Sequence, residues 1–299
     1  MKKKLLLTAL LALTLASCNK GANPSVSIIT PKGTPAIAIA NYAINHIDDV
    51  EVVAGAQPLV AAFGEETKDV IIAPINLGAL RYSAKQTYGL YKVLVWDNLY
   101  LVSRTEINSI EDLNGAKITS FGKGSTPQIV LEGALKAKNV TADITYLDNV
   151  NTANSQFVAS EADIIVSAEP NVSSLNKDGI YVKSLTDFWK EATGFDTYPQ
   201  SAMFVKYNKY EEIKSTLEEI CDLYDDILTD VEKTAKNAAA VVGMNENLLK
   251  KALPNCGFKS VENPKELVEA YYNQMIELGL SASLGGALPN ENFYELLKK

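Results

Sequence analysis

The stretch that decides the fold is residues 25–44, SVSIITPKGTPAIAIANYAI. Its first six residues are rich in β-branched side chains and predict a short buried strand. The Pro-Lys-Gly-Thr-Pro segment then turns the chain into an apolar helix. We expect Thr34 to cap this helix and Pro35 to occupy its first turn, where a missing N–H costs nothing. The stretch therefore predicts a strand, a glycine turn and a helix in direct succession.

The same pattern recurs further along the chain. Residues 116–137 read AKITSFGKGSTPQIVLEGALKA, with Lys-Gly-Ser-Thr-Pro in place of Lys-Gly-Thr-Pro. Each copy is followed by a second strand (50–53 and 142–146), a helix, and a third strand after Asp69 or Asp163. Each half thus reads β-α-β-α-β, which is typical of a parallel sheet with helices on both faces. One α/β domain with two similar turns stays open as the alternative.

The last third of the chain is helical by its pattern. Amphipathic stretches without intervening strands span residues 211–226, 231–242, 245–251, 265–278 and 292–297. We expect them to pack on an existing lobe rather than to form another cleft.

Composition excludes several classes of protein. The chain has 299 residues, enough for two domains, and its 47% hydrophobic content is that of a globular protein. Its net charge is −8, and Arg81 and Arg104 are its only arginines. A nucleic-acid partner needs a basic face, so this sequence argues against one.

The N-terminal residues have the pattern of a secretion signal. Three lysines precede an apolar run over residues 5–15, which is too short to span a bilayer. The following Leu-Ala-Ser-Cys resembles the bacterial lipobox. This resemblance implies that residues 1–17 are a signal peptide, that Cys18 carries a lipid such as palmitate, and that 18–24 are a tether to a bacterial membrane in the cell envelope, outside the cytoplasm. Removing the signal takes the charge from −8 to −11. A general secretory signal with an incidental cysteine is the alternative.

Three short motifs resemble one family. Residues 109–118 (SIEDLNGAKI), 168–170 (AEP) and 198–200 (YPQ) resemble segments of type II periplasmic or solute-binding proteins of ABC importers. The similar subfamily binds nitrate, sulfonates, taurine and thiamine pyrimidines. Individually the motifs are short, but their order covers most of the chain.

That resemblance implies a two-lobed α/β fold, the type II periplasmic-binding-protein fold, with two parallel-core sheets joined by two crossover strands. Lobe 1 would be residues 25–103 and 201–299, with the C-terminal helices on it, and lobe 2 residues 104–200. A small-molecule ligand would bind in the cleft. The monomeric protein would then deliver it to an ABC permease with its ATPase.

Candidate ligand-binding residues come first from the two glycine turns, which should face each other at strand carboxyl ends. Helix N-termini there offer free N–H groups and a partial positive charge for an oxyanion or another electron-rich group. Simple helix capping is the alternative for each turn alone. The candidates are Lys32, Gly33, Thr34, Lys123, Gly124, Ser125 and Thr126.

Further candidates lie at other strand ends and at the crossovers. Trp96 is expected to stack on a planar ligand, although core packing is its alternative, and Asp97 would favour a cationic or hydrogen-donating group or be a solvated turn residue. The remaining candidates are Asn76, Asn149, Asn151, Glu169, Tyr198 and Gln200.

The scarcity of arginine narrows the range of expected ligands. Amino-acid binders of this fold usually clamp a carboxylate with an arginine, and the predicted lobe 2 has only Arg104, beside Glu106. Small oxyanions, sulfonates and neutral or cationic heterocycles remain, with a slight preference for an aromatic ligand such as a thiamine pyrimidine.

Catalytic chemistry is not expected. The single histidine, His46, ends a predicted helix, and the sequence has neither a G-x-S-x-G nor a Walker A motif. Cys221 and Cys256 with one histidine make no credible zinc site, so neither a metal nor another cofactor is predicted, and the pairing of these cysteines stays open. The alternatives to a binding protein are a ligand-sensing lipoprotein and an enzyme of the same fold.

Overall fold

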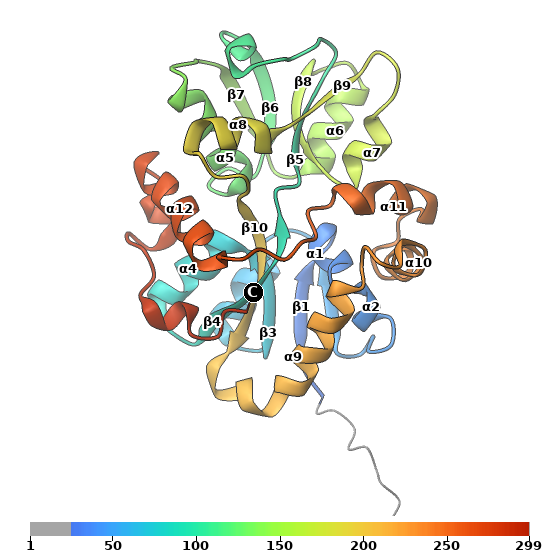
Figure 1. Cartoon of the computed structure of the whole chain (residues 1–299), viewed down its shortest axis with the longest axis vertical. Coiled ribbons are helices and arrows are strands. Elements are labelled where there is room, and N and C mark those ends of the chain that lie inside the picture. The colour runs from blue at the N-terminus through green and yellow to red at the C-terminus, as the bar shows by residue number, and fades with distance from the viewer. Residues whose placement is uncertain (1–24, 299) are drawn as a thin grey trace, which may run out of the picture.

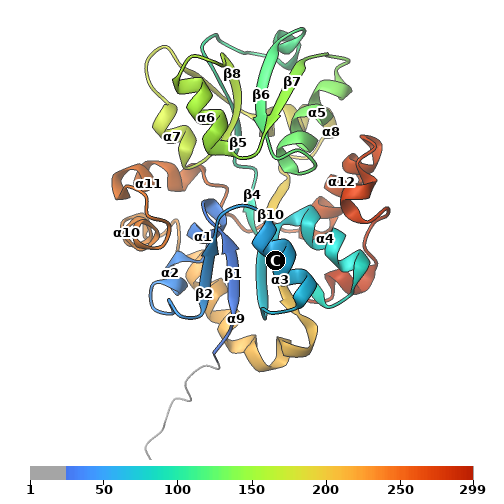
Figure 2. The same cartoon turned by 180° about the vertical axis from the view of Figure 1, so that it is seen from behind.

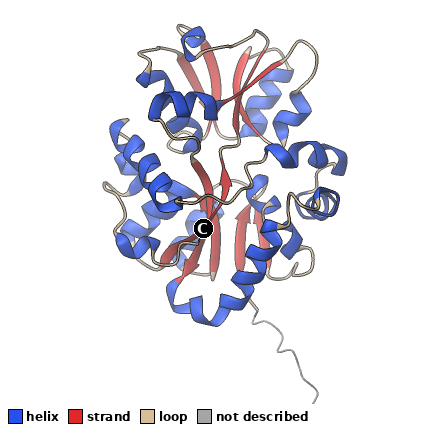
Figure 3. Cartoon of the chain, in the orientation of Figure 1, coloured by secondary structure: helices blue, strands red, loops and turns tan. Residues whose placement is uncertain are grey.

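Two lobes lie one above the other along the long axis of the molecule, in a computed structural model (Figure 1). The structure describes residues 25–298. The predicted signal peptide, the lipidation site Cys18 and the tether lie outside the described residues. Each lobe consists of a sheet with helices packed around it (Figure 3).

The first lobe is built on a five-stranded sheet with the order β2-β1-β3-β10-β4. β1 pairs in parallel with β2 and β3, while β10 runs antiparallel to both β3 and β4. The parallel strands follow from the predicted β-α-β-α-β unit, because a helix carries the chain back between them. The strands are β1 Ile28–Pro31, β2 Val50–Val53, β3 Val70–Pro74, β4 Tyr88–Trp96 and β10 Pro199–Lys206.

The second lobe repeats this arrangement, with the order β7-β6-β8-β5-β9. β6 pairs in parallel with β7 and β8, and β5 runs antiparallel to β8 and β9. The predicted two-lobed α/β fold is therefore confirmed, and each sheet is mixed through one antiparallel strand. The strands are β5 Leu99–Ser103, β6 Lys117–Phe121, β7 Asp143–Leu147, β8 Ile164–Ala168 and β9 Tyr181–Ser184.

The antiparallel strand of each sheet is supplied by the chain as it arrives from the other lobe. β5 follows β4 directly, yet Leu99 pairs with Ala168 and Tyr100 with Ser184, both in the second sheet. The predicted first lobe, residues 25–103, included this strand. By strand pairing the chain changes sheets at Asp97–Asn98 instead, and it returns at Tyr198, just before β10.

The crossover is marked by its backbone rather than by a change of hydrophobicity. Asp97 and Asn98 have φ of 57° and 71°, in the left-handed region that these two residue types tolerate better than most. The N–H of Asp97 donates to the carbonyl of Tyr198 at 2.9 Å, which joins the two crossovers side by side. Because the residues on either side are equally apolar, the sequence pattern continues through the break.

Helices cover both sheets (Figure 2). The helix predicted after the first glycine turn is broken in two at Ile39, whose backbone leaves helical geometry. The last predicted helix is a 3₁₀ turn over Glu291–Tyr294. The helices are α1 Thr34–Ile37, α2 Ala40–Ala43, α3 Gln57–Glu65, α4 Ile75–Ala84, α5 Thr126–Ala137, α6 Val150–Val158, α7 Asn171–Leu175, α8 Leu185–Thr193, α9 Tyr210–Asp225, α10 Val231–Val242, α11 Glu246–Ala252 and α12 Pro264–Glu277.

The C-terminal helices are not confined to the first lobe. α9 and α10 pack beside α2, as predicted, but α11 contacts α7 and α12 contacts α5 in the second lobe. In Figure 1, α11 and α12 flank the space between the lobes on opposite sides. Lys136 donates to the carbonyl of Glu277 at 2.5 Å, which ties α5 to the end of α12. The C-terminal region thus contacts both lobes.

None of the helices between residues 25 and 298 is long and apolar enough to cross a membrane. Cys221 and Cys256 are free thiols, which answers the question that the sequence left open. Burial raises the pKa of both thiols.

Candidate functional site

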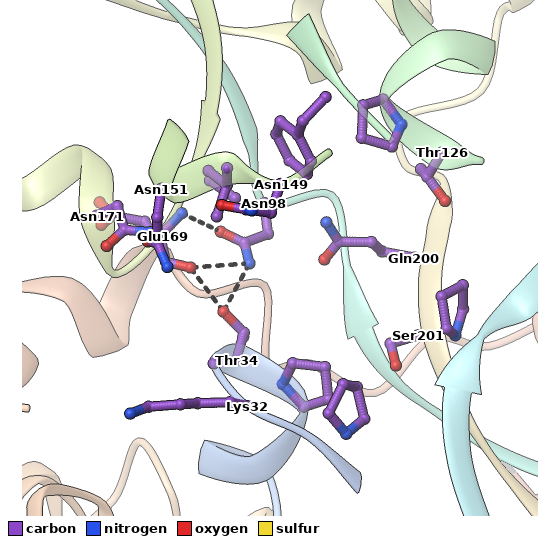
Figure 4. A pocket seen from close by; sticks show the side chains of 18 of the residues that line it. Lys32, Thr34, Asn98, Thr126, Asn149, Asn151, Glu169, Asn171, Gln200 and Ser201 are labelled. Atoms are coloured by element: carbon purple, nitrogen blue, oxygen red, sulfur yellow. Dashed lines mark hydrogen bonds between the residues drawn. The ribbon is translucent and has the colours of Figure 1, made fainter. Parts of the chain in front are cut away.

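A cavity of about 710 Å³ lies between the two lobes (Figure 4). Its wall includes Pro31, Pro74 and Phe121, the last residues of β1, β3 and β6. Ala168, the last residue of β8, also lines the cavity. Parallel α/β sheets bind ligands at this end of their strands, so the cavity is where the fold leads one to expect a site.

Nine of the fifteen predicted ligand-binding residues line this cavity. They come from both glycine turns, from the start of α6, from the end of β8 and from β10. These residues are Lys32, Gly33, Thr34, Ser125, Thr126, Asn149, Asn151, Glu169 and Gln200.

Thr34, Asn98 and Glu169 join the two lobes inside the cavity. The Thr34 hydroxyl donates to the backbone carbonyl of Glu169 at 2.7 Å, and the Asn98 amide donates to the Thr34 hydroxyl at 2.9 Å. The Asn98 side-chain carbonyl accepts from the Glu169 N–H at 2.8 Å. The predicted capping role of Thr34 is wrong, because its hydroxyl bonds to the other lobe and makes no cap.

The Glu169 carboxyl group, by contrast, points to α7. Its two oxygens accept from the N–H and the hydroxyl of Ser173, both at 2.9 Å. Burial raises the pKa of this carboxyl above its ordinary value, and the two bonds from Ser173 oppose that rise only in part. Glu169 therefore faces the cavity mainly through its backbone.

Both hydroxyls of the second glycine turn have hydrogen-bond partners within the protein. Ser125 donates to the carbonyl of Gly122 at 2.8 Å, and Thr126 shares a hydrogen bond of 3.0 Å with the hydroxyl of Tyr271 on α12. Gly122 and Gly124 adopt φ of 68° and 78°, which glycine reaches without strain. The turn presents the N-terminus of α5 to the cavity.

Carboxamides form the wall at the start of α6 and α7. The Asn149 side-chain oxygen accepts from the N–H of Thr152 at 3.1 Å and caps α6. Asn171 donates to the side-chain oxygen of Asn151 at 3.3 Å. These amides keep some hydrogen-bonding capacity toward the cavity, because each uses only part of it.

Gln200 and Ser201 lie on β10, at the back of the cavity. The Ser201 hydroxyl donates to the carbonyl of Ala73 at 3.1 Å. The Gln200 carboxamide points toward the middle of the cavity in Figure 4, and it has no hydrogen-bond partner among residues 25–298.

The structure does not bring the other six predicted residues to the cavity wall. Trp96 and Tyr198 are 1% and 0% exposed within the hydrophobic core, so ring stacking by Trp96 is not available. Asp97 accepts from Lys259 at 2.6 Å and from the Thr197 hydroxyl at 2.9 Å, which uses its charge at the crossover. The Trp96 and Asp97 predictions fail because the crossover turns both side chains away from the ligand space.

The remaining three predicted residues, Asn76, Lys123 and Gly124, lie beside the cavity. Asn76 donates to the carbonyl of Gly124 at 3.0 Å, which makes a second hydrogen bond between the lobes. Lys123 is exposed on the same turn. None of the three lines the cavity.

Sequence reasoning missed several lining residues, chiefly Asn98, Asn171 and Ser201. Each adjoins a motif that was recognised: Asn98 follows Asp97, Asn171 follows the Ala-Glu-Pro motif, and Ser201 follows Gln200. Proximity to those motifs was a usable signal. Met244, contributed by the C-terminal region, offered none.

The cavity holds little of what catalysis requires. Its described lining contains neither histidine nor cysteine. His46 stacks on Tyr42 with ring centroids 4.2 Å apart, outside the cavity. Over the described part of the chain, no cluster of His, Cys, Asp and Glu is arranged to hold a metal ion. The arrangement suits binding by hydrogen bonds and apolar contact.

Comparisons with known proteins place the fold. No protein-family model matches the chain, and no curated protein matches it. Solved structures do. A chain described as an ABC transporter from Parabacteroides distasonis has a TM-score of 0.75 and 18% identity, over 90% of this chain and 97% of that one.

Two further structures are similar. The periplasmic aliphatic sulphonate binding protein of Escherichia coli has a TM-score of 0.65 and 17% identity, covering 89% of this chain and 92% of its own. A zinc-bound ligand-binding component of an ABC-type import system from Staphylococcus aureus has a TM-score of 0.63 and 10% identity, covering 91% and 98%. This chain therefore has the fold of periplasmic binding proteins, as the sequence motifs implied.

Proposed function

We propose that this chain is the substrate-binding lipoprotein of an ABC transporter: it captures a small solute between its lobes and delivers it to a membrane permease with its ATPase. The observation that carries the proposal is the cavity between the lobes, lined by strand ends of both sheets and by Asn98 at the crossover. The similar structures support it: one is described as an ABC transporter, one as a periplasmic sulphonate binding protein and one as the ligand-binding component of an ABC-type import system.

The ligand is a small molecule. A cavity of about 710 Å³ lies within the range of pockets that hold metabolites and drug-sized compounds, roughly 300–1,000 Å³. Oxyanions, sulfonates and thiamine-pyrimidine-like heterocycles are the classes that the sequence motifs suggest. Two hydrogen bonds between the lobes, one from Thr34 and one from Asn76, would stabilise the arrangement that encloses the ligand.

The proposal includes a location. The lipobox-like segment before Cys18 would give a monomeric protein of the cell envelope, anchored by its lipid to a bacterial membrane and lying outside the cytoplasm. A lipid chain on Cys18 would keep the receptor close to its permease. Replacing Cys18 by Ser should abolish labelling by a radioactive fatty acid.

Two other functions fit the same fold. A ligand-sensing surface lipoprotein would bind its ligand equally well, but without a permease partner, so co-purification with a permease separates the two. An enzyme would return a changed molecule. The described cavity lining has no histidine or cysteine to support that chemistry, and recovering the bound molecule unchanged would count against it.

The test is a thermal-shift screen of soluble Cys18→Ser protein that has been unfolded and refolded to remove bound ligand. The panel contains nitrate, alkanesulfonates, taurine, thiamine and its pyrimidine, riboflavin, purines, amino acids and a small-molecule extract of bacterial cells. A ligand at a hundred times its Kd should add about 2.7 kcal/mol of stability, which raises Tm by roughly 5–10 °C in a chain of this size.

A pair of variants on α6 locates the binding. Asn151 lines the cavity, whereas Ser155, one turn later, does not. Asn151→Trp should remove the thermal shift by filling the cavity, and Ser155→Trp should preserve it. Absence of any shift, including with the extract, or an equal shift in both variants, would contradict the proposed function.

A further inference from the structure

The ionisable side chains around the cavity do not favour an anion. Three ionisable residues line it: Lys32 and Asp148, whose side chains are exposed, and Glu169, whose carboxyl group is bonded to Ser173. Because the Glu169 carboxyl is turned to α7, the cavity keeps one exposed acidic side chain, Asp148, and one exposed basic side chain, Lys32. Neither arginine of the chain lines the cavity; Arg104 instead bonds to the carbonyl of Phe157 at 2.5 Å. A buried anionic group would have only the exposed Lys32, and no buried cation, to compensate its desolvation.

Most neutral polar groups of the wall are already engaged. Thr34, Asn98 and Ser201 each bond within the protein, as do the hydroxyls of the second glycine turn. Gln200 differs from them, because its amide and its carbonyl have no partner among the described residues, and Figure 4 places them toward the middle of the cavity. A carboxamide presents a donor beside an acceptor in one plane.

Apart from the carboxamides at the starts of α6 and α7, much of the rest of the wall is apolar and stiff. Five prolines line the cavity, together with Phe121 and Met244. Proline rings have few conformations to lose, so they make rigid apolar surfaces against which a ring can lie. Such walls suit a compact, carbon-rich ligand. The prolines are Pro31, Pro35, Pro74, Pro127 and Pro170.

We infer that the cleft takes an uncharged ring compound, and that Gln200 recognises an edge of it that carries a hydrogen-bond donor next to an acceptor, as in a primary carboxamide, a sulfonamide or a lactam. This inference rests on the proposed function and gives its ligand a chemical class. Gln200 is then the specificity-determining residue, because a ligand lacking either group leaves half of a partly buried carboxamide unpaired.

Matched pairs of neutral and anionic compounds test the inference. The probes are nicotinamide against nicotinate and benzenesulfonamide against benzenesulfonate, each measured by titration calorimetry on ligand-free Cys18→Ser protein. Each pair has one ring and nearly one shape, and differs in charge and in the donor. We expect the amide of each pair to bind at least about 10-fold more tightly than its acid.

Two variants assign the effect to Gln200. Gln200→Leu removes both hydrogen-bonding groups and should weaken nicotinamide binding about 10-fold, with the Tm of the ligand-free protein unchanged. Gln86→Leu makes the same replacement at an exposed position far from the cavity lining, and should bind like the parent protein.

Each contrary result has its own meaning. Tighter binding of the acids would overturn the ligand class while supporting solute binding. Amide binding that Gln200→Leu leaves unchanged would overturn the role of Gln200. If neither pair binds at millimolar concentration, the inference fails, whereas the proposed function is still decided by the extract and by the Asn151→Trp variant.

Discussion

The two glycine turns share the sequence Lys-Gly-(Ser)-Thr-Pro, yet their threonines have different partners. Thr34, in the first lobe, donates across the cleft to the carbonyl of Glu169. Thr126, in the second lobe, pairs with the hydroxyl of Tyr271 behind the cleft. The repeated sequence forms a strand, a turn and a helix in both lobes, but the neighbouring elements determine the hydrogen-bond partner of each hydroxyl.

The difference divides two tasks between the lobes. The first turn contacts the other lobe through its threonine hydroxyl and starts a helix of only four residues. The second turn meets the other lobe through the Gly124 carbonyl, which accepts from Asn76. The second turn starts the 12-residue α5 and is anchored from behind by α12. We expect damage to the second turn to lower stability, and damage to the first to lower ligand affinity.

The largest effect should come from crowding the second turn. A Cβ on Gly122 would lie 2.7 Å from the Ser125 hydroxyl and 3.0 Å from Pro127. Gly122→Ala should lower the free energy of unfolding by about 2–3 kcal/mol, through backbone strain plus crowding. Gly115→Ala is the matched control, because Gly115 has a similar φ of 74° with open space around it, and should cost about 1 kcal/mol. Equal losses in urea denaturation would show that the turn is not tightly packed.

Next in size is the anchor behind the second turn. Thr126→Val leaves the buried hydroxyl of Tyr271 without its partner, and should lower the free energy of unfolding by about 1–2 kcal/mol. Tyr271→Phe should cost a similar amount, and the double variant less than the sum of the two. Strict additivity in the double-mutant cycle would mean that this hydrogen bond contributes nothing.

A smaller and different effect is expected at the first turn. Thr34→Val removes the hydrogen bond to Glu169 and the acceptor of the Asn98 amide. Ligand affinity should fall about 10-fold, because a contact between the lobes that encloses the ligand is lost. Small-angle scattering should show a more extended ligand-free protein than the parent. A larger loss of ligand affinity in Thr126→Val than in Thr34→Val would contradict the different roles of the two threonines.

The smallest effect is a dependence on pH. The pKa of Glu169 is raised above 4.5 by burial, so the native state keeps a proton that the unfolded state has released. The free energy of unfolding should therefore fall as pH rises from about 4.5 through the raised pKa. Urea denaturation across this range should give a flatter profile for Glu169→Gln. The exposed replacement Glu106→Gln should retain the parent's slope, and a slope unchanged in Glu169→Gln would contradict the assignment.

The fold was largely predictable from local patterns. Strand-turn-helix periodicity placed β2, β3, β6 and α5 to within about two residues, whereas β1 begins three residues later than predicted. The break between β4 and β5 was not predictable in this way, because apolar residues continue through it and only the backbone of Asp97 and Asn98 changes. Pairing of β5 with the second sheet is a long-range contact that no local pattern encodes.

The site was predictable in outline only. Turns at strand ends identified Thr34, Ser125 and Thr126, since parallel sheets bring those ends together. Trp96 was misassigned because an indole in an apolar strand packs equally well into a core, and its 1% exposure shows that it did. Polar and aromatic residues at strand ends suggest a binding site, but the direction of each side chain depends on tertiary packing.

The most direct test of solute capture is a crystal structure of the protein purified gently enough to retain its ligand. We expect a small molecule between the lobes, in contact with Gln200 and within reach of Asn98. Density for the ligand on an outer surface, with the space between the lobes empty or filled only by water, would contradict it.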